Sequence, residues 1–164
     1  VIVDVGRLVG RAASAQDLVS GYISGLEAAQ DRAAKRGVRP RVYFEEWDDP
    51  MISAIEWVSE LIEIAGGHDI FSDRSRGKLA KERFVQPEEV IAAAPEVMLA
   101  SWCGKPFDPE AVRAREGWGD IPALNTGRMH EIASAEILQP GPACLTAGLA
   151  AIERSLIGAV EPSS

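Results

Sequence analysis

Three of the four tryptophans lie where a predicted strand has just ended or in a long connection between strands. Trp47 follows an apolar strand at 41–45, Trp102 follows a second strand at 96–101, and Trp118 lies in the connection that leads to the last strand. Ligands of open parallel sheets bind outside the carboxyl ends of the strands, and tryptophan offers a broad apolar face with one polar N–H. These positions favour a surface for a large, flat, partly apolar ligand. The packing of loops onto the domain is the alternative interpretation.

Four carboxylates gather at the end of the first strand, and they belong to Glu45, Glu46, Asp48 and Asp49. Oxygen ligands of this kind bind hard cations such as Ca²⁺. The spacing of the EF-hand loop is absent, however, and a run of charge in a loop is usually a solvated turn. The sequence therefore favours a solvated turn, with a cation site as the minor alternative.

Cysteine and histidine supply few reactive groups, because the chain has only two of each. Cys103 could act as a nucleophile with His130 as its base, but no Gly-x-Ser-x-Gly elbow occurs. The C-x-x-C and H-x-x-x-H spacings of transition-metal sites are also missing, and we predict no metal site. Cys103 and Cys144 either form one disulfide or remain reduced thiols, and the sequence leaves both outcomes open.

Hydrophobic periodicity predicts the elements that position these residues. One long amphipathic helix is expected over 11–36, where apolar residues recur at steps of three and four, with Gly37 as its C-cap. Strands then alternate with helices, which is typical of parallel βαβ units. We therefore expect an α/β fold, a three-layer Rossmann-like lobe with a mostly parallel sheet, preceded by the long helix. Strands are predicted at 41–45, 83–85, 96–101 and 128–132, and helices at 52–65, 87–94, 108–115 and 143–159.

Length and charge exclude several classes of protein. The 164 residues suffice for one domain with a sizeable core. The 17 basic and 25 acidic residues give 17 − 25 = −8, which argues against a nucleic-acid partner. No apolar run is long enough to span a bilayer, and the start at Val1 lacks the pattern of a secretory signal. We expect the chain to be a piece of a longer protein.

A series of short motifs resembles the C-terminal lobe of the cobalamin-binding substrate-binding proteins of ABC transporters. The resemblance covers nearly the whole chain and includes the helix over 11–36, which resembles the rigid backbone helix between the two lobes of that class. The motifs are Glu45-Glu46-Trp47-Asp48-Asp49-Pro50, Trp57-Val58, Glu60-Leu61-Ile62, Ala65-Gly66-Gly67, Glu88-Glu89-Val90, Pro95-Glu96-Val97, Trp102-Cys103-Gly104, Gly117-Trp118, Gly127-Arg128 and Pro140-Gly141-Pro142.

The resemblance implies a function without chemistry. Such a protein holds cobalamin or a related corrinoid between two lobes, delivers it to a membrane permease, and uses no cofactor. Residues 1–37 would then be the segment with the interlobe helix and residues 38–164 the C-terminal lobe, with the N-terminal lobe absent from this chain. We expect a periplasmic or extracytoplasmic, membrane-associated location, provided that the missing part carries a signal peptide.

The resemblance also assigns roles to individual residues. Glu88, on the helix over 87–94, corresponds to the acidic residue that docks on permease arginines. The residues expected to contact the ligand are Trp47, Trp102, Cys103, Trp118 and Pro140. Three alternatives stay open: an iron–siderophore or haem receptor of the same class, a small α/β hydrolase-like enzyme that uses Cys103, and an interaction domain that dimerises through its long helix.

Overall fold

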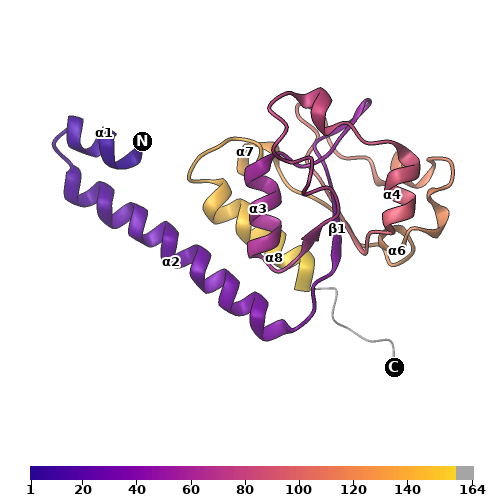
Figure 1. The fold of residues 1–164 in the computed structure, drawn as a ribbon, viewed down its shortest axis with the longest axis horizontal. Helices are drawn as coiled ribbons and strands as arrows, with labels where there is room; N and C mark the ends of the chain where they lie inside the picture. Colours follow the sequence, from indigo (N-terminus) through magenta and orange to yellow (C-terminus); the bar gives the residue numbers. More distant parts are fainter. Residues whose placement is uncertain (158–164) are drawn as a thin grey trace.

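A four-stranded parallel sheet forms the centre of the computed structural model, which describes residues 1–157 (Figure 1). All three strand pairs are parallel, so the predicted sheet type is confirmed. The strands lie in the order β4, β1, β5, β6, with bounds His68–Asp69, Arg41–Glu45, Val97–Ala100 and Met129–Glu131. Because β1 and β5 are central, their carboxyl ends meet in the middle of one sheet edge.

Helices cover both faces of this sheet and bury the alternating side chains of the central strands. Phe44 points into the core on one face, and Tyr43 and Met98 point into the core on the other. Complete burial of a side chain such as Phe44 contributes roughly 1.5–3 kcal/mol to stability. The predicted three-layer α/β architecture is therefore confirmed. The helices with α-helical geometry in the lobe are α3 (Glu56–Ile64), α4 (Pro87–Ala93), α5 (Pro109–Arg113), α6 (Pro122–Asn125), α7 (Ser134–Ile137) and α8 (Leu149–Ile157).

The long predicted helix is α2 (Ala12–Arg36), and Gly37 ends it in the left-handed conformation, with φ 70°. A short helix, α1 (Ile2–Leu8), precedes it and packs on its first turns, where a Cβ at Gly6 would overlap the side chain of Ala15. The C-terminal part of α2 contacts the lobe through the buried Ala29. Figure 1 shows α1 and the first part of α2 extending away from the sheet.

Two predictions around the first strand are wrong. The helix expected over 52–65 begins only at Glu56, because β3 (Met51–Ile52) pairs with β2 (Trp47–Asp48) in an antiparallel ribbon. The strand expected over 83–85 is instead a 3₁₀ turn, Ala80–Arg83, followed by one bridge from Phe84. Backbone hydrogen bonds from the Ser53 N–H to the Arg83 carbonyl (3.0 Å) and from the Val85 N–H to the Met51 carbonyl (3.1 Å) still pair this segment with the β3 segment, but the pairing is too short for a strand. Apolar residues alone do not distinguish these cases.

The C-terminal helix also differs from its prediction. The segment Cys144–Gly148 has π-helical geometry, and only Leu149–Ile157 is α-helical. The predicted last residues, 158–159, lie outside the described residues. Within residues 1–157, no helix combines the length and the apolar character that crossing a membrane requires.

Candidate functional site

The buried carboxylate of Glu45 is the centre of the polar contacts at the carboxyl edge of the sheet. It accepts hydrogen bonds from the Tyr43 hydroxyl (2.9 Å), from Trp102 Nε1 (3.0 Å), and from both terminal nitrogens of Arg115 (2.7 and 2.9 Å). Burial works against the charge of Arg115, but the hydrogen bonds to Glu45 raise the pKa of the guanidinium. A buried charge needs such partners, and Glu45 therefore fixes the orientation of the Trp102 indole.

Trp47 and Trp102 lie on either side of the Lys105 side chain. The Lys105 ammonium is 4.9 Å from the ring centroid of Trp47 and 4.8 Å from that of Trp102, within the range of cation–π contacts. The Trp47 N–H donates to the Asp49 carbonyl (2.8 Å), and Phe107 packs edge-on against Trp102 at 5.1 Å. Both indole N–H groups are thus used inside the protein. Trp47 is partly buried, whereas Trp102 is only 5% exposed and belongs to the core.

The four clustered carboxylates do not converge on one point. Glu45 pairs with Arg115, and Glu46 pairs with the buried Arg83 at 2.5 Å. Asp48 accepts a 2.6 Å hydrogen bond from Lys105, and Asp49 is exposed. In the part of the chain that the structure describes, no group of three or more His, Cys, Asp or Glu side chains is arranged to hold a metal ion. Separate cations compensate the charges that the sequence places together.

Asp48 titrates in an environment that favours its ionised form. Partial burial alone would raise the pKa of this carboxyl, but the hydrogen bond from Lys105 and the charges of Lys105 and Arg115 lower it. The Asp48 carboxyl therefore stays ionised at neutral pH.

Trp118 lies away from any open surface, although the sequence predicts it at the ligand. Its side chain is 0% exposed and packs in the core against Tyr43 (6.2 Å between ring centroids) and under the Arg115 guanidinium (4.5 Å). Ligand contact would require Trp118 to leave the core. Trp118 instead packs against the Arg115 guanidinium, which pairs with Glu45.

Cys103 and Pro140 are exposed on two different loops. Cys103 directly follows Trp102 at the carboxyl edge, and Pro140 lies in the loop after α7. Within residues 1–157, Cys103 and the buried Cys144 are both free thiols, so the disulfide alternative does not form. His130 lies within β6, opposite Leu99, and shares no hydrogen bond with Cys103 in the described residues. The nucleophile–base alternative has no geometric support.

Glu88 and Glu89 lie in the first turn of α4, and in the described residues only Glu89 has side-chain partners. Glu89 receives two hydrogen bonds from Arg74 and one from the Gln86 N–H (2.8 Å), which lower its pKa to about 2. Glu88 is exposed, and no hydrogen bond or ion pair of its carboxylate occurs in the described residues. It lines a groove of about 720 Å³ together with Asp49, Phe84 and other residues.

Two cationic residues of this edge, Lys105 and Arg115, are missing from the sequence prediction. Both lie in the connection after β5. Lys105 pairs with Asp48, which follows β1, and Arg115 pairs with Glu45, the last residue of β1. Their position in the sequence is the signal that could identify them. They lie three and thirteen residues after Trp102, and the acidic cluster follows the other predicted strand that ends in a tryptophan. Only the parallel pairing of β1 with β5 brings the two segments together.

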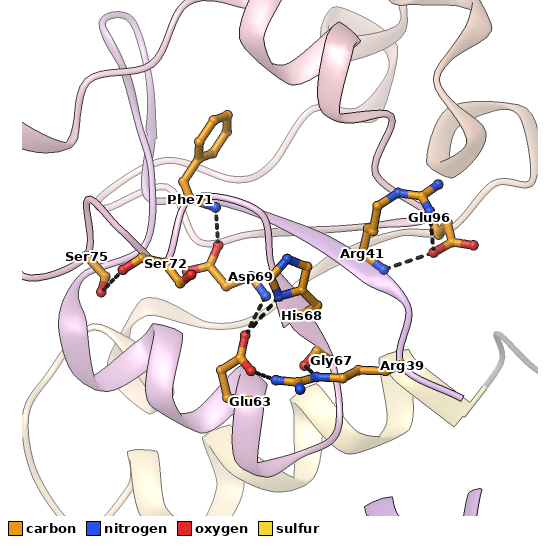
Figure 2. Close-up of polar contacts among 10 residues, drawn as sticks. All are labelled: Arg39, Arg41, Glu63, Gly67, His68, Asp69, Phe71, Ser72, Ser75 and Glu96. Carbon is orange, nitrogen blue, oxygen red and sulfur yellow. Dashed lines mark hydrogen bonds and ion pairs between the residues drawn. The ribbon is translucent and has the colours of Figure 1, made fainter. Parts of the chain in front are cut away.

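A second polar network lies near the amino ends of β1 and β4 (Figure 2). Glu63 accepts a hydrogen bond from the Asp69 N–H (2.9 Å), forms an ion pair with Arg39, and lies 3.4 Å from the His68 Nδ1 atom. The nearby Arg41 N–H donates to Glu96 (2.9 Å). These contacts tie the strand starts to α3 and to the loops, and they belong to the scaffold.

Comparisons with solved structures give the same fold for this chain. A possible iron-binding periplasmic solute-binding protein of Staphylococcus epidermidis matches with a TM-score of 0.79 at 20% identity, over 94% of this chain and 59% of that one. The periplasmic haem-binding protein of Roseiflexus sp. RS-1 matches at 0.73 and 24%, over 94% and 61%. The periplasmic vitamin B12-binding protein of Vibrio cholerae matches at 0.70 and 18%, over 98% and 62%.

These matches define the fold and leave the ligand open, because the identities are low and the solved proteins differ in what they bind. The chain spans about three fifths of the length of these structures. The curated proteins contain no match.

The sequence profile described as periplasmic binding protein matches residues 2–135, more than half of the chain. This family and the solved neighbours are periplasmic solute-binding proteins and not enzymes. The chain therefore belongs to the periplasmic binding protein family.

Proposed function

We propose that this chain is the C-terminal lobe and interlobe helix of an ABC-importer receptor for cobalamin or a related corrinoid. The observation that carries the proposal is the partly buried Trp47 at the carboxyl ends of the two central strands, with the core residue Trp102 behind Lys105. A corrinoid is broad, flat and partly apolar, so it suits a fixed aromatic surface such as Trp47, whose N–H group is already satisfied. Cys103 and Pro140 lie on exposed loops that could extend this surface.

The uncovered apolar side chains of α1 and α2 support the two-lobed arrangement. Leu8 is 86% exposed, Leu18 46% and Ile23 50%. An N-terminal α/β lobe packed against α1 and the first part of α2 would cover them, and the chain spans only about three fifths of its solved relatives. In this proposal residues 1–37 connect the lobes and the chain from residue 38 onward forms the C-terminal lobe, of which residues 158–164 lie outside the described residues. The assembled receptor works outside the cytoplasmic membrane.

An iron–siderophore is the second candidate ligand. The solved relatives include an iron-binding protein and an Fe³⁺-hydroxamate transport protein, as their names state. Haem is an equal alternative, because two of the solved relatives are periplasmic haem-binding proteins, as their names state.

Titration of the complete two-lobed protein with cyanocobalamin, a ferric hydroxamate and haemin tests the ligand. We expect cyanocobalamin to bind tightly and to quench the tryptophan fluorescence. Trp47→Ala should lower the affinity at least about tenfold, because a large aromatic contact is lost. Lys81→Ala, on an exposed 3₁₀ turn, is the control and should leave affinity unchanged. Preferential binding of the hydroxamate would select the second candidate, and binding of none of the three would reject the proposal.

Glu88 is the proposed permease contact on this lobe. Its free, exposed carboxylate is available to a permease arginine, whereas Arg74 already neutralises Glu89. We expect Glu88→Ala to lower transport by the complete importer about tenfold or more, with unchanged ligand affinity, since one charge-assisted contact is lost. Glu60→Ala on α3 is the matched control. Unchanged transport by Glu88→Ala would contradict the assignment.

A further inference from the structure

The groove of about 720 Å³ that Glu88 lines is built from three segments that are distant in the sequence. They are residues 48–51 of the β2–β3 ribbon, the segment 84–91 that leads into α4, and residues 115–117 after α5. We use the name α4 groove for this surface. It extends the position of the single Glu88 carboxylate into a surface that is large enough for side chains of a partner.

Backbone and ionic contacts hold the walls of the α4 groove in place. The Val85 N–H donates to the Met51 carbonyl (3.1 Å), which fixes the segment before α4 against the ribbon. The Arg115 guanidinium donates to the buried Glu45 at 2.7 and 2.9 Å, which fixes the third segment. A surface that is already formed loses little conformational entropy when a partner binds.

Apolar side chains line part of the α4 groove. Phe84 is 37% exposed, Ile91 is half-buried, and Met51 is buried at 8% exposure. The wall at Gly117 lies close to α4, because a Cβ at Gly117 would be 3.0 Å from the Ile91 Cδ1 atom. Covering the exposed part of Phe84 would remove apolar surface from water. The groove therefore suits an apolar side chain.

The exposed part of the α4 groove is acidic. Asp49, Glu88 and Glu116 are exposed, and their carboxylates form no ion pair or hydrogen bond within residues 1–157. Arg115 also lines the groove, but its charge is compensated by the buried Glu45. The groove thus has a surplus of negative charge beside its apolar side chains. This surface favours a partner segment that is basic and partly apolar.

We propose that the α4 groove docks a loop of the permease that presents an apolar side chain next to an arginine. The arginine pairs with Glu88, and the apolar side chain packs against Phe84 and Ile91. The inference rests on the proposed function, in which Glu88 contacts the permease, and it adds an apolar anchor to that contact. Charge complementarity and the continuity of the groove with Glu88 select this occupant, because a loop that reaches Glu88 also covers the groove.

Binding of the complete two-lobed receptor to its importer in lipid nanodiscs tests the α4 groove, with surface plasmon resonance as the readout. Phe84→Ala should weaken this binding at least about fivefold, because an apolar anchor is lost, and Phe84→Leu should retain most of it. Glu116→Gln should weaken binding about twofold at low salt and have less effect at high salt. Affinity for the transported ligand should stay unchanged in all three variants, which also shows that they are folded.

Leu79→Ala and Asp120→Asn are the matched controls. Leu79 is 54% exposed and Asp120 is exposed, and both lie outside the α4 groove. Importer binding by Phe84→Ala that equals binding by Leu79→Ala would overturn the proposal. If Glu88→Ala weakens importer binding and Phe84→Ala does not, the groove is rejected and the Glu88 contact stands. If Phe84→Ala weakens binding and Glu88→Ala does not, the groove is supported and the Glu88 assignment fails.

Discussion

Glutamate–arginine pairs lie at both the carboxyl ends and the amino ends of the strands, but they differ in burial. At the carboxyl edge, Glu45 is 0% exposed and accepts four hydrogen bonds, two of them from Arg115. At the amino edge, Glu63 and Arg39 form an ion pair whose side chains are 30% and 59% exposed (Figure 2). Water screens the Glu63–Arg39 pair but not the Glu45–Arg115 pair, so the two ion pairs differ in their contribution to stability.

The comparison shows that burial decides the role of a carboxylate. The buried hub of Glu45 fixes an indole and a guanidinium at the site, and removing it would leave buried charge without compensation. The exposed pairs link elements whose positions the apolar core already sets. Site geometry therefore depends on the carboxyl edge far more than on the amino edge.

Glu45→Ala is the sharpest way to break this comparison. It leaves the Arg115 guanidinium and the Trp102 N–H without their acceptor, and we expect a loss of about 3–5 kcal/mol in the free energy of unfolding. Urea denaturation followed by circular dichroism measures it. Glu45→Gln retains an acceptor and should lose less. A loss below about 1 kcal/mol for Glu45→Ala would show that the hub is not buried as described.

Asp69, in β4, tests an intermediate case. It is 1% exposed, its Oδ1 accepts the Phe71 N–H (3.1 Å), and its Oδ2 has no partner among the described residues. Burial raises the pKa of Asp69, so the folded state binds this proton more tightly than the unfolded state. This contribution to stability is complete below the unfolded pKa and is lost as pH rises through the folded pKa.

Asp69→Asn removes that titration. Relative to the wild type, the variant should gain about 1 kcal/mol as the pH rises from about 3 to 7, the scale of an unpaired buried polar group. Denaturation at several pH values measures the difference. A gain that runs in the opposite direction with pH would mean that Asp69 is stabilised as an anion.

Glu63→Gln should have the smallest effect. The amide oxygen can still accept the Asp69 N–H, and only the charge facing Arg39 and His68 is lost. We expect less than about 1 kcal/mol, and less still in high salt. The same denaturation assay at low and high ionic strength measures it. A loss as large as that of Glu45→Ala would remove the distinction between the two edges.

The sequence predicts the helices and strands around the site better than the roles of its individual residues. The period of the apolar residues identified the long helix, and the alternation of strands and helices identified the parallel sheet. Trp47, Trp102 and Trp118 look equivalent in the sequence, yet Trp102 and Trp118 are core residues, 5% and 0% exposed, and Trp47 is partly buried. Local position does not distinguish a cleft aromatic from a core aromatic, because the distinction depends on segments distant in the chain.

The sequence by itself determined the fold class and the edge of the sheet at which polar and aromatic residues gather, because hydrophobic periodicity and the succession of elements are local properties. Only the tertiary structure decided which residues meet there. The pairing of Glu45 with Arg115, the seating of Lys105 between two indoles, and the separation of Cys103 from Cys144 all join segments that are far apart in sequence. The parallel register of β1 and β5 sets those distances, and burial then determines which charges and ring faces are left for a ligand.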